Sequence, residues 1–389
     1  MTLINHIKIT LISFFSYFFT GSLVIVTGMI MGNIAKYFKT SIASISHTFT
    51  FLNSGILIAI FLNFWLIKNM SIKIQIYSGF ILIIIAIIGM IYTNNLIIFG
   101  ISIFLFGIVS GITMSISTYL ISSLYNNKNR ATVLLITDSF FSMAGMIFPL
   151  ISSRIISNNK PWYWMYILIG IIYFIIFIIT ISTNFSKLNF SNQKNYTFIQ
   201  NYHTKISVIL LSISATCYIL GQLGFISWIP EYIIQKMHIT INHAGKLVSS
   251  FWMAYMIGMW FFSIILKLFD IQKLLSVLTG ISTILMYLFI NNNNIVQLNW
   301  IIALLGFFSS AIYTIIITLS SLQTNIPSNK NINLILISGT IGTLLTFIVT
   351  GFIVEKAGIY ATLITSNILY TIVFLLSILL GFFTVHKKY

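Results

Sequence analysis

The feature that most constrains this chain is a succession of long apolar runs, which recur along nearly all of its 389 residues. Apolar side chains make up 58% of the sequence and charged ones only 6%, whereas soluble domains carry about a quarter charged residues. A run of about 20 apolar residues is long enough to cross the hydrocarbon core of a bilayer. The composition therefore predicts an integral membrane protein and excludes a soluble, disordered or nucleic-acid-binding one.

Each apolar run is interpreted as an α-helix, because backbone groups in hydrocarbon must be hydrogen-bonded within their own segment. The predicted fold class is all-α, with twelve transmembrane helices separated by polar breaks. The expected helices cover residues 7–34, 42–67, 74–93, 96–124, 131–156, 161–183, 206–233, 243–267, 273–290, 297–322, 331–354 and 358–384. The polar stretch 184–205 predicts a linker between two six-helix bundles, at residues 1–183 and 206–389.

The distribution of basic residues predicts how the helices are oriented. Of the 20 Lys and Arg residues, 13 lie on the side that holds both termini and the linker, and 7 lie on the other. An excess of Lys and Arg marks the cytoplasmic loops of membrane proteins. Both termini and the linker are therefore expected in the cytoplasm, and the net charge of +16 follows from this topology.

The two halves resemble each other at an offset of about 200 residues. LIKNMSIKIQIYSG, ending at Gly79, aligns with LKLFDIQKLLSVLTG, ending at Gly280. Each segment is a short basic turn between two helices, and Lys73 aligns with Lys273. A repeat in the same membrane orientation indicates two halves related by an axis along the membrane normal, as in duplicated transporters.

Several motifs give the chain a resemblance to a known family. Asp138 to Pro149 reads DSFFSMAGMIFP, and the aromatic cluster Trp162-Tyr163-Trp164 follows it. Two further motifs are Asn63-Phe64-Trp65-Leu66 and Trp228-Ile229-Pro230-Glu231-Tyr232. With twelve helices, a basic linker and a parallel repeat, the whole chain resembles the major facilitator superfamily. Its motifs resemble the TsgA branch, which is related to fucose-permease-like sugar symporters.

This resemblance implies two pseudo-symmetric six-helix bundles in a bacterial inner membrane, with a monomer moving a small solute by alternating access. The chain departs from the superfamily's common Gly-x-x-x-Asp-Arg-x-Gly-Arg turn between helices two and three. Its own turn, Leu66 to Lys73, reads LIKNMSIK. The turn keeps the basic charge and lacks the acidic partner, so a gating salt bridge built on that motif is not expected here.

The chain has only four acidic residues, and one of them, Asp138, lies inside a predicted span. It is seven residues into that helix, about 10 Å from its cytoplasmic end. An Asp near a helix centre costs about 2.5 to 3.5 kcal/mol, so such residues face a wet cavity or a partner. Asp138 is the candidate for proton coupling. The alternative is a structural carboxylate paired with Arg130 or Lys128.

The other three acids lie near predicted helix ends. Glu231 follows Pro230 and is a candidate gate, with a surface ion pair to Lys236 as the alternative. Asp270 is expected in a solvated cytoplasmic turn, and Glu355 is expected at the surface.

A transport cavity is built from uncharged polar and aromatic side chains, because rings stack on sugar-like solutes and amides exchange hydrogen bonds with them. The candidates are Asn53, Tyr119, Gln222, Trp252, Tyr255 and Tyr313. Gln222 is favoured because Gly221, Gly224 and Pro230 interrupt its helix, and transporters place their sites in broken helices. For each candidate, packing between helices is the alternative.

The motifs also separate the classes of function. The step Gly245-Lys246 is followed by Leu247 and lacks the upstream glycine of a phosphate-binding loop, which argues against an ATP-driven pump. Paired acids, a Ser-His set and metal-ligand spacing are missing from the sequence, so an enzyme and a cofactor are not expected.

The sequence therefore predicts a secondary transporter for a small neutral or cationic solute, coupled to protons. Its expected partners are that solute, protons and membrane lipid. An efflux antiporter, favoured by Gly145-x-x-x-Pro149, and a membrane protein without transport activity are the alternatives.

Overall fold

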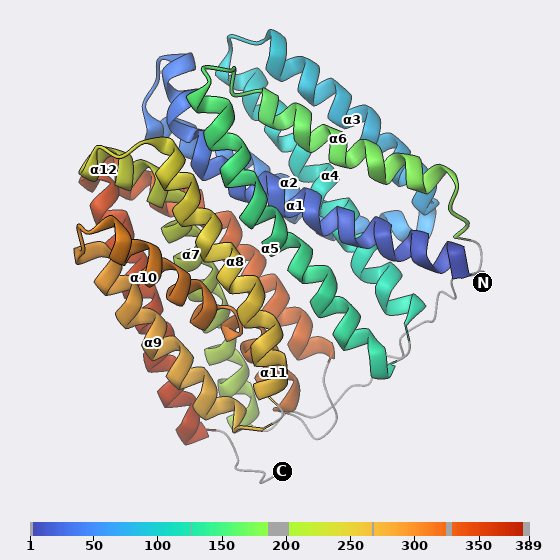
Figure 1. Ribbon diagram of the computed structural model, residues 1–389. Helices are drawn as coiled ribbons and strands as arrows, with labels where there is room; N and C mark the ends of the chain where they lie inside the picture. The colour runs from blue at the N-terminus through green and yellow to red at the C-terminus, as the bar shows by residue number, and fades with distance from the viewer. Residues whose placement is uncertain (1–2, 126, 186–201, 267, 324–328, 384–389) are drawn as a thin grey trace. The chain divides into compact units, whose positions relative to one another are not determined.

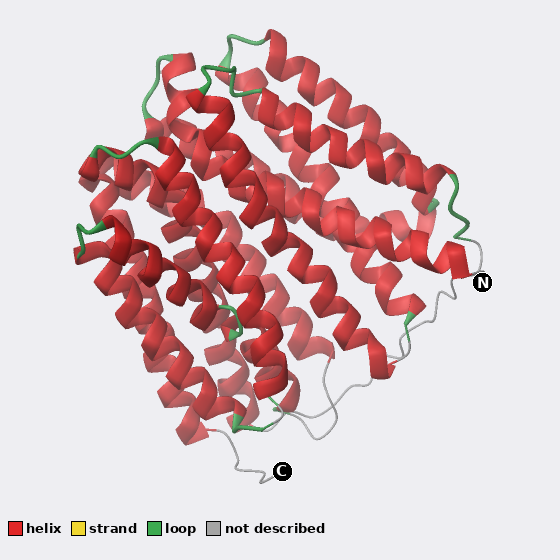
Figure 2. Cartoon of the chain, in the orientation of Figure 1, coloured by secondary structure: helices red, strands yellow, loops and turns green. Residues whose placement is uncertain are grey.

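The computed structural model describes residues 3–125, 127–185, 202–266, 268–323 and 329–383. Within these ranges every regular element is an α-helix, and no strand occurs (Figure 2). The helices are α1 (Leu3–Phe38), α2 (Ile42–Asn69), α3 (Ile72–Tyr92), α4 (Leu96–Leu124), α5 (Asn127–Ser157), α6 (Trp164–Ile181), α7 (Tyr202–Met237), α8 (Ile241–Ile265), α9 (Ile271–Asn291), α10 (Ile295–Ser309), α11 (Ile312–Leu322) and α12 (Asn329–Phe383). The predicted all-α fold class is confirmed.

Eleven helical stretches in the described part of the chain are long and apolar enough to cross a membrane. One of them, Leu334–Gly381, has 48 residues, which is more than twice the length that one crossing needs. Gly358 divides this stretch, because its backbone has φ 83° and ψ 174° and leaves the helical region. Only glycine adopts this conformation readily. Twelve crossings therefore fit the helices, as the sequence predicts.

The predicted boundaries need three corrections. The expected helix 297–322 is interrupted at Ser310 and Ala311, so that α10 and α11 together form one span, Ile295–Ser320. The loop expected between residues 354 and 358 is absent, since the helix continues to Gly358 and resumes after it. Several helices extend beyond their apolar runs, such as α1 and α7 with 36 residues each. Polar residues form helix as well as apolar ones do, so hydropathy marks the membrane boundary rather than the helix end.

The chain forms two compact units, which are described separately (Figure 1). The first contains residues 1–192 and 239–249, and the second contains residues 193–238 and 250–389. The first part of α8 thus belongs to the first unit. The predicted linker 184–205 lies mostly outside the described residues, and the division into six helices and six stays a prediction.

In the first unit, α1 packs against α2, α4, α5 and α6, and α2 lies along α4. Glycines permit this close approach: a Cβ atom on Gly107 would collide with the Leu52 carbonyl oxygen, and one on Gly111 would lie 2.5 Å from that of Ile56. Small residues at such contacts let membrane helices pack backbone to backbone. In the second unit, α7 and α9 both pack against α12, and α11 contacts all three.

Candidate functional site

Asp138 presents an exposed side chain on α5, between two buried neighbours. The hydroxyl groups of both neighbours are hydrogen-bonded within α5. Thr137 donates to the Val133 carbonyl at 2.7 Å, and Ser139 donates to the Ile136 carbonyl at 2.7 Å. Among the described residues, Asp138 has no hydrogen-bond or ion-pair partner. The side chains of Lys128 and Arg130, the predicted structural partners, lie outside the described part.

A tyrosine on α1 faces this carboxyl group. Tyr17 is buried, interacts electrostatically with Asp138, and lies with its hydroxyl 2.8 Å from the Thr118 hydroxyl on α4. Thr118 itself donates to the Met114 carbonyl at 3.0 Å. A threonine hydroxyl has one hydrogen, so Tyr17 is the donor in the bond to Thr118. The oxygen of Tyr17 is therefore left with acceptor capacity.

Aromatic contacts and one glycine hold α1 against α5 on either side of this site. The rings of Phe14 and Phe140 stack with centroids 4.4 Å apart, and those of Phe18 and Phe148 meet edge-on at 5.9 Å. A Cβ atom on Gly21 would lie 2.6 Å from the Phe141 carbonyl oxygen. This packing fixes the position of Tyr17 relative to Asp138. We call Tyr17, Thr118 and Asp138 the acidic site.

The predicted cavity residues of the first unit lie at different levels. Asn53 is buried on α2, next to Leu52, where Gly107 of α4 makes its close approach. Tyr119 is half-buried on α4, twelve residues beyond Gly107, which is about 18 Å along the helix. Asn53 and Tyr119 therefore do not line one compact site.

The other four candidates lie in the second unit. Gln222 on α7 is 4% exposed, and its Nε2 atom has no hydrogen-bond partner among the described residues. The rings of Trp252 and Tyr255 on α8 pack with centroids 5.3 Å apart. Tyr313 on α11 directs its hydroxyl at Gly339 of α12, where a side chain would collide with it. Trp252 and Tyr255 are thus neighbours, and Gln222 is a buried amide with unused donor capacity.

A second polar cluster lies in the core of the second unit, and Tyr255 is its one member among the predicted cavity residues. The Tyr218 hydroxyl donates to the Ser309 carbonyl at 2.6 Å, and the Tyr370 hydroxyl donates to the Ser309 hydroxyl at 3.5 Å. Ser309 in turn donates to the hydroxyl of Ser282 at 3.3 Å. Tyr255 interacts with both tyrosines. We call Tyr218, Tyr255, Tyr370 and Ser309 the tyrosine cluster.

The tyrosine cluster lies where α10 ends. The carbonyl of Ser309 is the last of α10, and Tyr218 supplies it with a donor. Tyr218 and Tyr370 are almost completely buried, with exposed fractions of 0% and 1%. In the sequence, two serines, Ser309 and Ser310, interrupt an apolar run, and this is the signal that could have indicated the helix break. The cluster stabilises a helix break inside the unit.

The other three acids occupy helix ends. Asp270 is the N-cap of α9, where its Oδ1 accepts from the amides of Gln272 at 2.9 Å and Lys273 at 3.1 Å. Glu231 is half-buried on α7, and the nearby Lys236 donates to the Tyr232 hydroxyl at 2.8 Å. Glu355 is exposed and lies close to the break at Gly358. Asp138 is therefore the acid that lies farthest from a helix end or from this break in the described chain.

Comparison with known proteins decides the family. The model of the Major Facilitator Superfamily matches residues 10–325. The chain belongs to the Major Facilitator Superfamily. Within it, the chain is 56% identical to "Protein TsgA homolog" of Buchnera aphidicola subsp. Acyrthosiphon pisum (strain Tuc7), over 100% of this chain and 99% of the relative. It is 52% identical to "Protein TsgA" of Shigella flexneri, over 100% and 98%.

Solved structures of the superfamily share the fold. The transporter FucP in its outward conformation superposes with a TM-score of 0.65 at 17% identity, covering 98% of this chain and all of that one. The nucleoside transporter NupG gives a TM-score of 0.76 at 13% identity, with the same coverage. The predicted resemblance to the TsgA branch is confirmed. The chain is a multi-pass membrane transporter of this superfamily rather than an enzyme.

Proposed function

We propose that this chain is a proton-coupled secondary transporter, which moves a small neutral or cationic solute across the bacterial inner membrane by alternating access. The observation that carries the proposal is the acidic site: an exposed carboxyl group on a membrane-spanning helix, without a described ion-pair partner and beside a tyrosine hydroxyl. A carboxyl group in such a position is a functional feature by default in membrane proteins. Asp138 is the proposed coupling acid.

The hydrogen bonding of the acidic site depends on whether Asp138 carries a proton. Tyr17 donates to Thr118, so its oxygen is available to accept a hydrogen bond, and in our proposal the donor is the neutral carboxyl group of Asp138. A neutral carboxyl group can donate that hydrogen bond, whereas a carboxylate has only acceptors. Loss of the proton therefore requires Tyr17 to change partner or water to enter. This links the protonation state to the contact between α1, α4 and α5.

One acid is energetically sufficient for this task. A single charge that crosses a membrane potential of 150 mV gains about 3.5 kcal/mol. At about 1.4 kcal/mol for each tenfold change, this supports a solute gradient of several hundredfold.

The charge distribution supports a neutral or cationic solute. Each Lys and Arg in the described helices lies within about two turns of a helix end or of the break at Gly358. No basic group in the described spans thus compensates an anionic solute in mid-membrane. The buried amide of Gln222 and the rings of Trp252 and Tyr255 suit a polar, sugar-like solute. The structurally similar NupG is a nucleoside transporter, which is consistent with this class.

The remaining parts of the proposal concern topology. Both termini and the linker are placed in the cytoplasm by the bias of basic residues. The protein acts as a monomer, with Glu231 as a gate at the outer end of α7.

The test is proton uptake into proteoliposomes that contain the purified protein, measured while neutral sugars, nucleosides and small cations are added one at a time. One solute is expected to drive proton entry in the wild type and in Asp270→Asn, which removes an acid at a helix cap and keeps the capping side chain. Asp138→Asn is expected to abolish it. A solute that is exchanged without proton movement in the wild type contradicts coupling. Proton release instead of uptake establishes efflux antiport in place of symport.

A further inference from the structure

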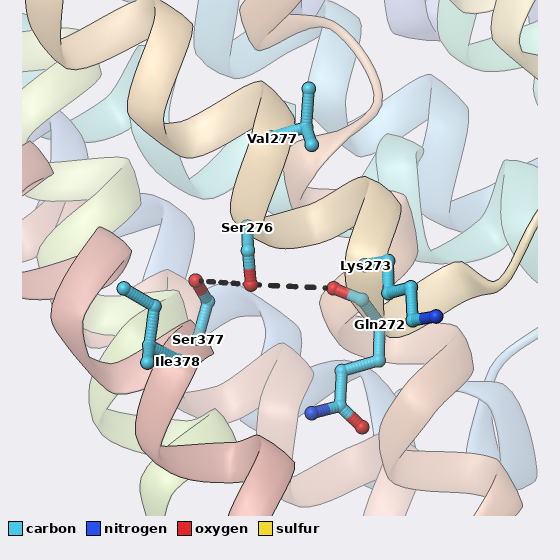
Figure 3. A pocket seen from close by; sticks show the side chains of 6 residues that line it. All are labelled: Gln272, Lys273, Ser276, Val277, Ser377 and Ile378. Carbon is cyan, nitrogen blue, oxygen red and sulfur yellow. Dashed lines mark hydrogen bonds between the residues drawn. The ribbon is translucent and has the colours of Figure 1, made fainter.

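A groove in the second unit lies between the first turns of α9 and the last part of α12 (Figure 3). Its volume is about 450 Å³. The side chains that line it are Gln272, Lys273, Ser276, Val277, Ser377 and Ile378. None of these residues belongs to the acidic site or to the predicted solute cavity, so the transport proposal leaves the groove unexplained.

The groove is lined mainly by apolar atoms, and the two serine hydroxyl groups at its base are hydrogen-bonded within the unit. Ser377 donates to the Ser276 hydroxyl at 3.0 Å, and Ser276 donates to the Gln272 carbonyl at 3.5 Å (Figure 3). The Nε2 amide of Gln272 lies against Gly381, where a Cβ atom would be only 2.9 Å away. Ser377 also donates to the Phe374 carbonyl at 2.7 Å. The polar groups are thus engaged within the unit, and the groove is a mainly apolar surface close to the end of a span.

Lys273 adds a positive charge at the rim. Its side chain is exposed, and its ammonium group makes no ion pair or hydrogen bond with a described residue. The nearby carboxylate of Asp270 accepts from two backbone amides of α9 and so serves as the helix cap. The rim therefore offers one cation that has no described partner, beside a mainly apolar groove.

The walls of the groove continue into a bilayer-facing apolar surface. Val277 is 55% exposed and Ile378 is 42% exposed. One or two turns farther along the same faces lie Ile284 on α9, 60% exposed, and Leu375 on α12, 52% exposed. Exposed aliphatic side chains on a membrane-spanning helix contact acyl chains.

We propose that this groove binds an anionic phospholipid. The phosphate lies at Lys273, and an acyl chain follows Val277 and Ile378. The charge complementarity between Lys273 and the phosphate carries this assignment, since basic residues at the membrane surface attract anionic lipids. An exposed cation beside a mainly apolar groove matches the two ends of a lipid and does not match a free phosphate ion.

The repeat supplies a matched control position. Lys73 begins α3 as Lys273 begins α9, but its Nζ atom donates to the Ile181 carbonyl at 3.2 Å, at the end of α6. Lys73 is therefore hydrogen-bonded to the end of a helix. Its substitution removes the same charge as that of Lys273, at a position that does not line the groove. The two lysines separate a specific site from a general effect of basic charge.

The test is native mass spectrometry of the full-length protein in detergent, with added phosphatidylglycerol or the zwitterionic phosphatidylcholine, and it requires no transport activity. The wild type is expected to retain phosphatidylglycerol preferentially. Lys273→Gln is expected to lower that binding about fivefold, the weight of one basic charge near an anionic surface. Lys273→Arg is expected to restore it, and Lys73→Gln to leave it unchanged. Asp270→Asn, which keeps the cap, is expected to strengthen it.

Equal retention of the two lipids by the wild type overturns the proposal. So does an equal loss in Lys73→Gln and Lys273→Gln, because that result assigns the effect to net charge alone. The helical circular dichroism of each variant, compared with the wild type, identifies a loss of binding that comes from unfolding. If Lys273→Gln does not fold, Lys273→Arg is compared with Ser377→Leu, whose larger side chain fills the groove. The proposal requires Lys273→Arg to retain phosphatidylglycerol and Ser377→Leu to lose it. Unchanged binding of phosphatidylglycerol in Ser377→Leu contradicts the proposal.

Discussion

Two tyrosines that lie about 200 residues apart, Tyr17 on α1 and Tyr218 on α7, have opposite surroundings. Tyr17 donates to Thr118 and faces the exposed carboxyl group of Asp138. Tyr218 donates to the Ser309 carbonyl in a cluster with the buried Tyr370 and the half-buried Tyr255, and none of these side chains is acidic. The first tyrosine has a partner whose charge can change, and the second closes a helix break.

The difference indicates that one type of side chain has different tasks in the two units. A hydroxyl group bound to a backbone carbonyl has a partner with a fixed role, so Tyr218 stabilises one packing of its unit. A carboxyl group is a donor when it is protonated and only an acceptor when it is not. A buried tyrosine thus serves rigidity in the second unit and, in our proposal, proton coupling in the first.

The largest expected effect on stability comes from truncation of the buried tyrosine. Tyr218→Ala removes a completely buried ring and leaves a cavity, which is expected to cost about 3 to 5 kcal/mol of unfolding free energy. Tyr17→Ala is expected to cost less, because its hydroxyl end borders the exposed site. Denaturant unfolding in detergent, followed by circular dichroism, measures both. An equal loss of unfolding free energy in the two variants would contradict the proposed difference in stability between the two sites.

A smaller effect is expected when only the hydroxyl group is removed. Tyr218→Phe leaves the Ser309 carbonyl without its donor, for an expected cost of about 1 to 2 kcal/mol, at the upper end of hydrogen bonds measured in membrane helices. Phe289, which is buried in the same unit without a hydroxyl group, provides the matched control as Phe289→Tyr. The same unfolding assay applies. A Tyr218→Phe protein as stable as the wild type would show that the α10 break needs no support.

Removal of the hydroxyl group from Tyr17 is expected to affect transport rather than stability. Tyr17→Phe removes the hydroxyl group that, in our proposal, accepts from protonated Asp138, so the pH profile of solute-driven proton uptake is expected to shift. Tyr218→Phe is expected to keep the wild-type profile even where it lowers the amount of folded protein. The measurement is proteoliposome uptake at a series of pH values, normalised to reconstituted protein. A shift in Tyr218→Phe that matches the one in Tyr17→Phe would contradict the division of tasks.

The smallest effect distinguishes the two repeat-related turns. Asp270 caps α9 with two hydrogen bonds, of 2.9 and 3.1 Å, whereas Ser71 caps α3 with one of 3.4 Å. Asp270→Ala is expected to cost about 1 kcal/mol, as for a typical N-cap, and Ser71→Ala to cost less. Asp270→Asn is expected to be nearly neutral, because Asn caps equally well. Thermal unfolding of the four proteins in detergent ranks them, and the reverse order for the two alanine variants would be evidence against this reading.

The helices were largely predictable because the bilayer imposes one strong rule on the sequence. The apolar runs gave the number of crossings, but not the interruption at Ser310 and Ala311 or the continuous helix up to Gly358. Hydropathy describes which solvent surrounds a residue. It carries no information on which carbonyl, such as that of Ser309, finds a donor outside its own helix.

The acidic site was predictable in part for a related reason. Asp138 was identified because a charge inside a span is rare and costly. Tyr17 and Thr118 were not, since hydroxyl side chains are common in spans and usually bond to their own helix, as Thr137 and Ser139 do. Only the packing of α1 against α4 and α5 brings Tyr17 to Asp138. The candidates Asn53, Tyr119, Gln222, Trp252, Tyr255, Tyr313 and Glu231 stay predictions.

A paired assay on Asp138→Asn shows whether Asp138 couples protons to solute movement. Solute-driven proton uptake and exchange of labelled for unlabelled solute are measured in the same proteoliposomes. The variant is expected to lose proton uptake and to retain exchange, since Asn preserves the shape of the site and cannot release a proton. Proton uptake at the wild-type rate in Asp138→Asn would contradict this role of Asp138.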